Sequence, residues 1–291
     1  MRAARNLSHV EIVLLLELSE PTSFTAAAAA LGVTQSAVSK MVLSLEEQFG
    51  LELVSRGRQG CEPSARLKRA RPALLRALQS IDEAGNELRR ADGALLGKMR
   101  IAGFRSATSI LLPPAISGFL NRHPDLQVSI ATVPETGGGV VERVVQGRAD
   151  FGVTTSKPPR ELQSCHLGSD PYVLVCRKDA HKMDVTSQRL VLWNENCSDR
   201  VPEILSFYGW KPKRIMRVDN DLTVLSMIDH GGGFTIMPRL ATEPLCGTLK
   251  AQPLSDFRRD IWLCGQPLMW ASFGGRALRR AVVLGSSHLR E

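Results

Sequence analysis

The sequence predicts an all-α N-terminal domain with a short β-wing over residues 1–63, a long helix over residues 64–92, and a two-lobed α/β region over residues 97–291. Three observations support this prediction. Apolar residues in the first ninety positions recur at helical spacings, glycines and a proline interrupt them between residues 50 and 63, and short apolar strands alternate with helical segments after residue 97. With 291 residues, of which 43% are hydrophobic, the chain is long enough for two packed cores.

The charge balance favours a polyanionic partner such as nucleic acid, but only weakly. The formal net charge is +8. Residues 1–76 hold ten Lys and Arg against seven Asp and Glu, a net of only +3. Most of the positive excess therefore lies outside the segment that the helical pattern marks as a separate domain.

The six cysteines are scattered without a CxxC pair, so we expect free thiols in a reducing compartment and neither a zinc site nor a disulfide framework. Glu11 and Glu17 interrupt the N-terminal apolar run, and no small-residue cleavage site follows it. No stretch approaches the ~20 uncharged apolar residues of a membrane span. We therefore expect a cytoplasmic protein without a membrane partner.

The first helix is expected from Leu7, Val10, Leu14 and Leu18, which recur at spacings of three and four and build one apolar face. Glu20, Pro21 and Thr22 end it. Ser23 is placed to cap a second helix over residues 24–31, because its hydroxyl can accept a free backbone N–H there.

A helix-turn-helix follows from the next turn. Gly32 can adopt the left-handed conformation that ends a helix, and Thr34 can cap the next helix two residues later. The third helix then has a buried stripe of Ala37, Val38, Met41, Val42 and Leu45. Its other face carries short polar groups suited to reach base edges in the major groove, namely Gln35, Ser36, Ser39, Lys40 and Ser44.

The segment LELVSRGRQGCEP predicts a two-stranded wing, because strand-forming residues are followed by Gly57, Gly60 and Pro63. Arg56 and Arg58 are expected on it. The helical stripe of residues 64–92 comprises Leu67, Leu74, Leu78, Ile81 and Leu88. Since no other globular partner for this stripe is evident from the sequence, we expect this linker helix to pair with a second copy of the chain.

Residues 97–291 predict a largely parallel α/β arrangement. The strands MRIAGF, LQVSIATV and ADFGVTT alternate with helical segments, and YVLVCR, LVLW, RIMRVD and FTIMP supply enough further strands for a second sheet. Two linked lobes fit this length.

The sequence SFTAAAAALGVTQSAVSKMVLSLEEQFGLELVSR, residues 23–56, resembles the DNA-binding domain of LysR-type transcriptional regulators. The resemblance continues through MRIAGFRSATSILLPPAISGFLNRHPDLQVSI, VVERVVQGRADFGV, DPYVLVCRKDAH and VLSMIDHGGGFTIMPR, in the family's order and spacing. It implies promoter DNA as partner, a two-lobed effector domain like that of periplasmic solute-binding proteins, homodimers that assemble into homotetramers, and effector-dependent control of transcription. RNA polymerase is a further expected partner.

The resemblance implies that the polar start of the third helix enters the major groove and that Ser23 and Thr25 face phosphates. Gln can pair with adenine and Lys can contact guanine, which agrees with this role. The expected DNA-binding residues are Ser23, Thr25, Thr34, Gln35, Ser36, Ser39, Lys40, Arg56 and Arg58. With so few positive charges on this helix, a second subunit is expected to contribute to phosphate binding. The chain departs from the family at Ser36, where proline is usual, and at Arg66 and Leu67, where a small residue and glycine are usual.

The resemblance also implies an effector site between the lobes, beside the first strand and the helix that follows, where free backbone donors favour carboxylates. Phe104 stands where a small hydroxyl residue is common. Arg105 either supplies charge for an anionic ligand or is a solvated loop arginine. The expected effector-binding residues are Phe104, Arg105, Ser106, Thr136, Asn196, Cys197, Ser198 and Thr223.

The segment LVLWNENCSDR resembles the surroundings of the reactive cysteine in the family's peroxide sensor, but Ser206 and Phe207 stand where a resolving cysteine would be needed. Cys197 is therefore either an oxidant-reactive thiol or a structural or ligand-contacting one. The glycine runs 137–139 and 231–233 lack a phosphate-binding motif. No catalytic group, metal ligand set or cofactor is expected beyond a small-molecule effector.

One alternative to a ligand-gated transcription factor remains open at this point. The α/β region could be a solute-binding or enzymatic module, with the N-terminal helices serving only for assembly. The effector's identity and the sign of regulation do not follow from the residues.

Overall fold

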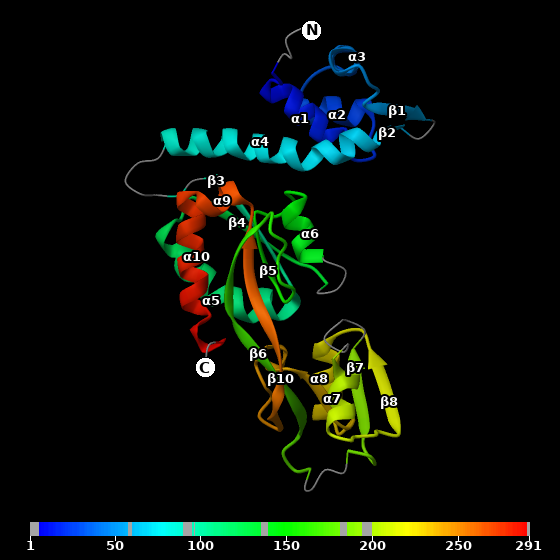
Figure 1. Ribbon diagram of the computed structural model, residues 1–291, viewed down its shortest axis with the longest axis vertical. Coiled ribbons are helices and arrows are strands. Elements are labelled where there is room, and N and C mark those ends of the chain that lie inside the picture. The colour runs from blue at the N-terminus through cyan, green and yellow to red at the C-terminus, as the bar shows by residue number, and fades with distance from the viewer. Residues whose placement is uncertain are drawn as a thin grey trace. The chain divides into compact units, whose positions relative to one another are not determined.

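The computed structural model describes residues 6–57, 60–89, 95, 97–134, 139–180, 185–193 and 200–289. The chain divides into two compact units, Met1–Gly93 and Ala94–Glu291. Figure 1 labels their elements.

Unit 1 begins with three capped helices, α1 (His9–Glu17), α2 (Phe24–Leu31) and α3 (Gln35–Phe49). A capping box starts α1, because Ser8 N donates to a Glu11 carboxylate oxygen at 2.7 Å while Ser8 Oγ accepts from Glu11 N. Gly32 ends α2 with φ +66°, as its predicted left-handed turn requires. The axes of α2 and α3 differ by 102° across this turn, so the predicted helix-turn-helix is present.

The core of unit 1 shows which face of α1 is buried. Ile12, Leu14, Leu15 and Leu18 are at most 6% exposed, whereas Val10 is 47% exposed. The predicted apolar face was therefore wrong at Val10. Because six of the nine residues of α1 are apolar, periodicity alone could not distinguish two neighbouring faces of this helix.

The wing consists of β1 (Val54–Gly57) and β2 (Gly60–Pro63), which pair antiparallel. Its base is joined to the segment before α2, since Cys61 N donates to Thr22 O at 2.8 Å and Thr22 N donates to Cys61 O at 3.2 Å. Gly60 has φ +125°, and a Cβ there would lie 2.4 Å from Thr22 O. Glycine is therefore required at this crossing.

Helix α4 (Ala65–Arg89) begins at Ser64, whose Oγ accepts from Leu67 N at 3.3 Å. Leu67 and Leu74 are buried in the core of unit 1, but Ile81 is 45% and Leu88 89% exposed. The expectation that the whole stripe lacks a domain to pack against was therefore wrong for its first half. Only the second half leaves large apolar side chains exposed.

The main sheet of unit 2 has the strand order β4-β3-β5-β10-β6-β9. Strands β3 (Gly97–Gly103), β4 (Leu126–Thr132) and β5 (Phe151–Thr154) run parallel. The long strands β6 (Gln163–Arg177) and β10 (Leu249–Gly265) pair antiparallel with each other, with β5 on one side and β9 (Thr235–Pro238) on the other. The sheet is thus mixed rather than largely parallel, because β6 and β10 pair directly, without a crossover helix between adjacent parallel strands.

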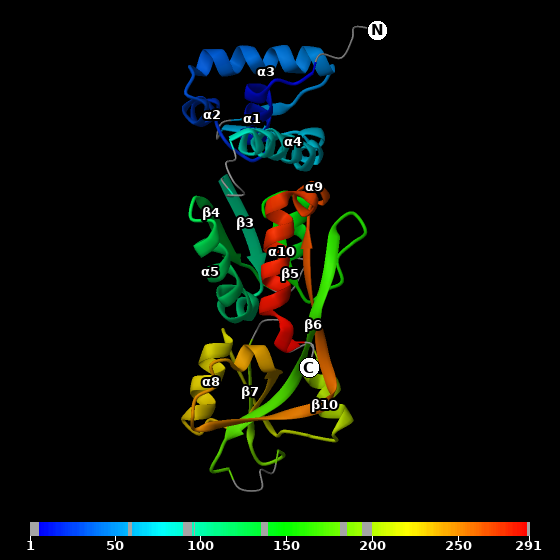
Figure 2. The same cartoon turned by 90° about the vertical axis from the view of Figure 1, so that its left-hand side faces the viewer.

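Strands β6 and β10 run through both lobes of unit 2 (Figure 2). The first lobe has β3–β5, α5 (Leu112–Arg122), α6 (Gly139–Val145), α9 (Pro267–Ala271) and α10 (Phe273–Gly285). The second has a parallel pair, β7 (Arg189–Trp193) and β8 (Arg214–Val218), with α7 (Val201–Phe207), α8 (Asp221–Asp229) and β9. Residues of β7 alternate between two hydrophobic clusters, one with α7 and one with α8.

Unit 2 also contains short helices: η1 (Ala107–Leu111) before α5, η3 (Arg239–Thr242) after β9, and η4 (Ser287–Leu289) after α10. Among the described residues, no single helix is long and apolar enough to cross a membrane. Helices α2 and α3 together reach the length and apolar composition of a membrane span, but the chain bends by 102° between them.

Candidate functional site

The first candidate site is the N-terminal part of α3. Its buried side is formed by Val38, Val42 and Leu45, whereas Gln35 and Lys40 on the other side are exposed. Thr34 Oγ1 accepts from Ala37 N at 3.2 Å, which satisfies a free donor of the first turn and fixes where the helix begins. The helix therefore presents exposed polar side chains from a first turn whose position is fixed by its cap.

Other predicted DNA-binding residues lie at the caps and in the first turns of α2 and α3. Ser36 is exposed, and its hydroxyl lies 3.0 Å from that of Thr34. Ser23 Oγ caps α2 by accepting from Ala26 N at 3.1 Å, and Thr25 is exposed in the first turn. Ser39 is half-buried. The hydroxyls of Ser23 and Thr34 thus serve as helix caps in this structure.

The wing is attached to α3 through Glu46. Its Oε1 accepts from Leu53 N at 2.8 Å and from Val54 N at 3.5 Å. This carboxylate fixes where the chain leaves α3 and enters β1, which carries Arg56 opposite Cys61 in the ladder. Arg58 lies outside the described residues.

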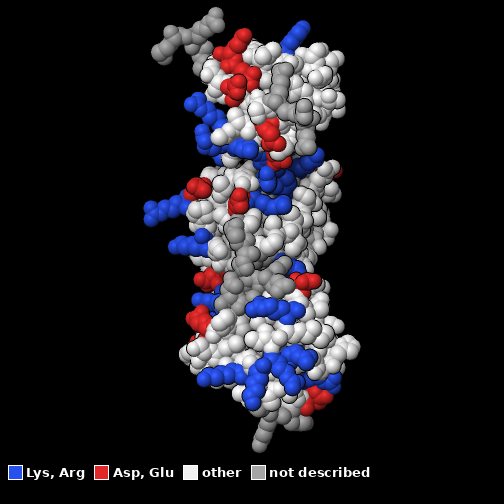
Figure 3. Space-filling model, turned by 90° about the vertical axis from the view of Figure 1, so that its right-hand side faces the viewer, with Lys and Arg blue, Asp and Glu red and all other residues white. Residues whose placement is uncertain are grey.

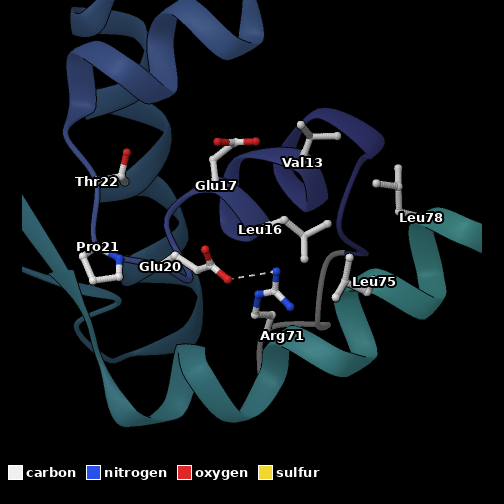
Figure 4. Close-up of a pocket in the computed structure, with 9 residues that line it drawn as sticks. All are labelled: Val13, Leu16, Glu17, Glu20, Pro21, Thr22, Arg71, Leu75 and Leu78. Atoms are coloured by element: carbon white, nitrogen blue, oxygen red, sulfur yellow. Dashed lines mark ion pairs between the residues drawn. The ribbon is translucent and has the colours of Figure 1, made fainter. Parts of the chain in front are cut away.

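A pocket of about 380 Å³ lies between α1, the turn after it and α4 (Figure 4). Arg71 Nη2 forms an ion pair with Glu20 Oε1 at 3.2 Å across its edge. The wall combines apolar and charged side chains: Val13, Leu16, Glu17, Glu20, Pro21, Thr22, Arg71, Leu75 and Leu78.

The second candidate site is the boundary between the lobes of unit 2. Phe104 and Ser106, which follow β3, are 2% and 3% exposed. The Arg259 guanidinium lies over the Phe104 ring at 4.7 Å, and its Nη2 donates to Ser106 Oγ at 3.2 Å. Both predicted effector-contacting side chains are thus packed against an arginine of β10.

Asp170 and Arg259 were not identified from the sequence. Arg259 Nε and Nη2 donate to Asp170 Oδ2 at 3.0 and 2.9 Å, while Asp170 Oδ1 accepts from Leu240 N at 2.9 Å. The two residues are 89 positions apart, so no local pattern links them. Asp170 directly precedes the apolar run 171–176, but Arg259 lies among the charged residues Asp256, Arg258 and Asp260, so no sequence signal marked it.

Arg105 is neither a solvated loop residue nor an unpaired cation. Its Nη2 forms an ion pair with Asp221 Oδ2 in the other lobe, and the side chains are 23% and 8% exposed. The same guanidinium donates to Ser109 Oγ at 3.3 Å and to Ala241 O at 3.4 Å. Asp221 is the first residue of α8, where the helix dipole favours a carboxylate.

The remaining predicted effector residues are not brought together by the described structure. Thr223 is exposed, and its N–H and hydroxyl both donate to Asn220 Oδ1, the cap of α8. Thr136, Asn196, Cys197 and Ser198 lie outside the described residues.

Basic side chains gather on the second lobe of unit 2 (Figure 3). Four exposed basic residues lie on β8 or just before it: Lys211, Lys213, Arg214 and Arg217. These four residues account for part of the positive net charge that lies outside residues 1–76. Within the described residues, no group of three or more His, Cys, Asp or Glu is placed to hold a metal ion.

Comparisons with known proteins assign both units. Residues 10–68 match the family described as "Bacterial regulatory helix-turn-helix protein, lysR family", and residues 92–283 match "LysR substrate binding domain". A probable HTH-type transcriptional regulator, LrrA of Synechococcus elongatus, is 31% identical over 258 residues, which cover 86% of each chain.

Two solved structures show the same fold. The crystal structure of ArgP from Mycobacterium tuberculosis matches with a TM-score of 0.77 and 19% identity, over 98% of this chain and 99% of that one. Full-length CbnR, solved in complex with its target DNA, matches with a TM-score of 0.62 and 18% identity, over 94% of this chain and all of that one.

These findings confirm the predicted fold class. They also decide the alternative left open by the sequence, because the matched families and relatives are transcriptional regulators and not enzymes. The LysR substrate-binding domain binds small-molecule effectors, and LysR regulators bind DNA and form oligomers. The chain belongs to the LysR family of transcriptional regulators, with a helix-turn-helix DNA-binding domain and an effector-binding domain.

Proposed function

We propose that this regulator reads double-stranded promoter DNA with the first two turns of α3. The observation that carries the proposal is the capped, exposed polar start of this helix opposite the buried Val38, Val42 and Leu45. Gln35, Ser36, Ser39 and Lys40 would contact base edges in the major groove, where each good base contact is worth ~1–3 kcal/mol of discrimination.

Phosphate contacts would come from the flanks of α3. Ser23 caps α2, Thr25 lies in its first turn, and Thr34 caps α3, whereas Arg56 and Arg58 belong to the wing segment. Since Lys40 is the single positive residue of α3, which also holds Glu46 and Glu47, we propose that two subunits share the binding.

Helix α4 is the proposed dimer contact. Ile81 and Leu88 expose apolar surface on its second half, and the pocket beside its first half is lined by Leu75 and Leu78. A second copy of the chain would cover this surface, giving a homodimer or, by further assembly, a homotetramer. RNA polymerase at the same promoter is the proposed further partner, and the cytoplasm the proposed site of action.

In unit 2 we place the small-molecule effector at the interlobe boundary near Phe104, Arg105 and Ser106. Parallel strands of both lobes end there, and such ends are the common position of ligands in open α/β folds. Effector binding would change how the lobes contact each other and thereby promoter binding.

The test is salt-dependent footprinting on the promoter of the protein's own gene, comparing the full chain with Gln35→Ala and Lys40→Ala. Each substitution should weaken promoter binding by about 1–3 kcal/mol, with the unfolding free energy nearly unchanged because both side chains are exposed.

Glu47→Gln is the matched control, because Glu47 is exposed at the far end of the same helix. It should leave the specific footprint in place. Equal binding of the wild type to promoter and random DNA, with candidate effectors present, would refute the proposed function.

A further inference from the structure

The contact between Arg105 and Asp221 joins two strand ends that face one another across unit 2. Arg105 follows β3 of the first lobe, and Asp221 follows β8 of the second. Their ion pair is thus a point where the two lobes touch, at the boundary proposed above for the effector. The inference below rests on that proposed function.

Both residues keep one buried polar atom without a partner among the described residues. Arg105 Nε, a donor, and Asp221 Oδ1, an acceptor, are each inaccessible and make no hydrogen bond there. Asp221 is 92% buried by its side-chain exposure of 8%. Buried polar atoms are nearly always paired in proteins, so these two atoms together indicate where an acceptor and a donor of a ligand would be bound.

The charged side chains beside this contact balance each other, and polar groups hold Arg105 and Asp221 in position. Arg259 and Asp170, which pack beside Ser106, neutralise each other. Ser109 and the Ala241 carbonyl accept from the guanidinium of Arg105 and hold it in position. Asp221 is held at the start of α8, which the Asn220 side chain caps.

Because the charges of Arg105 and Asp221 neutralise each other, the pair restricts which charges a ligand can carry. An anion that took Arg105 away from Asp221 would leave a buried carboxylate unpaired, and a cation that took Asp221 would leave the arginine unpaired. Either loss is severe, since a single buried charge without its partner is strongly unfavourable. A molecule with one group of each charge replaces both halves of the contact at once.

We propose that Arg105 and Asp221 are the effector-selecting pair, and that the effector is a small zwitterion whose carboxylate binds Arg105 and whose ammonium binds Asp221. Because the two side chains are in direct contact, the two charged groups of the ligand must lie close together, as they do in an α-amino acid. The fork of Arg105 suits a carboxylate, and Asp221 accepts from an ammonium through Oδ1.

The test uses the full chain and the twenty L-amino acids, screened by the shift in thermal unfolding midpoint. Each amino acid that stabilises the protein is then compared by calorimetry with its deaminated acid and its decarboxylated amine. Examples are leucine with 4-methylpentanoate and 3-methylbutylamine, or arginine with 5-guanidinopentanoate and agmatine. The wild type should bind the amino acid about tenfold or more tightly than either analogue, since each analogue lacks one charge-assisted contact.

Two variants that each remove one charge of the pair should abolish the two preferences separately. Asp221→Asn should remove the preference for the amino acid over the deaminated acid, and Arg105→Gln should remove the preference over the amine. Asp179→Asn is the matched control, because it also removes an Asp–Arg ion pair, with Arg177, but at an exposed place. It should bind like the wild type.

Three results would each overturn the inference: no shift with any amino acid, an analogue that binds the wild type as tightly as its amino acid, or unchanged selectivity in Asp221→Asn. Footprinting of the same preparations, with and without each amino acid, distinguishes failure of the zwitterion proposal from failure of the proposed function. Normal promoter binding with one of these results rejects only the zwitterion, whereas a wild type that does not recognise its promoter rejects the proposed function itself.

Discussion

Asp170 of β6 and Arg259 of β10 lie directly opposite each other in the antiparallel ladder and form an ion pair in which both side chains are at most 6% exposed. The pair also reaches Ser106 and Leu240, so four separate chain segments meet at it. Because β6 and β10 run through both lobes, this contact lies on the structure that connects them.

Arg259→Ala should destabilise unit 2 by about 3–5 kcal/mol, because it leaves the Asp170 carboxylate buried without its cation. Urea unfolding followed by circular dichroism measures this loss. The double variant Asp170→Leu/Arg259→Met should recover much of it, since no unpaired charge remains. Arg177→Ala breaks an exposed ion pair and should cost less than about 1 kcal/mol; equal losses for Arg177→Ala and Arg259→Ala would contradict the prediction.

Gly60→Ala should destabilise unit 1 more than Gly50→Ala. Both glycines have positive φ, so each substitution carries backbone strain of about 1–3 kcal/mol. Only at Gly60 would the new Cβ also collide with a backbone oxygen, that of Thr22 at 2.4 Å, whereas nothing lies within 4 Å at Gly50. Thermal unfolding of both variants compares them. The prediction fails if the two melting points fall equally.

Thr34→Ala should lower the unfolding free energy of unit 1 by about 1 kcal/mol, because the Ala37 N–H loses its capping oxygen. Thr34→Asn keeps an acceptor at this position and should retain most of the stability. Chemical denaturation of the three proteins provides the measurement. If Asn and Ala had the same effect, the hydroxyl would not be acting as a cap.

Asp260 should make unit 2 more stable above about pH 4 than at lower pH. Hydrogen bonding from Ser169 Oγ, followed by the nearby His166, lowers the pKa of this carboxyl from its ordinary 3.8. A lowered pKa in the folded state stabilises the protein above the unfolded pKa, and this contribution is lost as the pH falls through the folded value.

The melting point of the wild type minus that of Asp260→Asn, recorded from pH 2 to 7, should therefore be positive above the ordinary pKa and decline below it. Ser169→Ala should move this decline towards pH 3.8. A difference that does not depend on pH would argue against an ionised Asp260 as the stabilising group.

Cys264 should resist alkylation while Cys246 reacts. Burial raises the pKa of the Cys264 thiol to about 12, and its side chain is fully buried, whereas Cys246 is exposed. At pH 8.5 less than about one in a thousand Cys264 thiols would be ionised, and the thiolate is the reactive form. Mass spectrometry after brief iodoacetamide treatment tests this, with the protein in denaturant as the control in which both residues react. Labelling of Cys264 as fast as Cys246 would contradict the prediction.

The helix-turn-helix was predictable because its determinants are local. A capping hydroxyl such as that of Thr34 acts within one turn, and the positive φ of Gly32 depends on its missing side chain. The apolar stripe of α3 also followed from spacing, since a helix alone determines which residues share a face. Where apolar residues occupy more than one face of a helix, as in α1, the same reasoning chose the wrong residue at Val10.

The interlobe site was predictable only as a region. Residues 104–106 were expected near the effector from the resemblance, but not that Arg259 would engage Phe104 and Ser106. Their partner lies 153 positions from Ser106 and belongs to a strand whose direct pairing with β6 was not foreseen. Side-chain partners this far apart in the sequence depend on how the strands are arranged in space. The spacing of apolar residues does not indicate that arrangement.

The sequence by itself thus determined the helices, their caps, the polar face of α3 and the family to which the chain belongs, because those properties arise within a few consecutive residues or from matched motifs. Only the tertiary structure decided that the first half of the linker stripe is buried within unit 1, and that Arg105 meets Asp221 instead of solvent. Burial and charge pairing depend on residues brought together from distant parts of the chain.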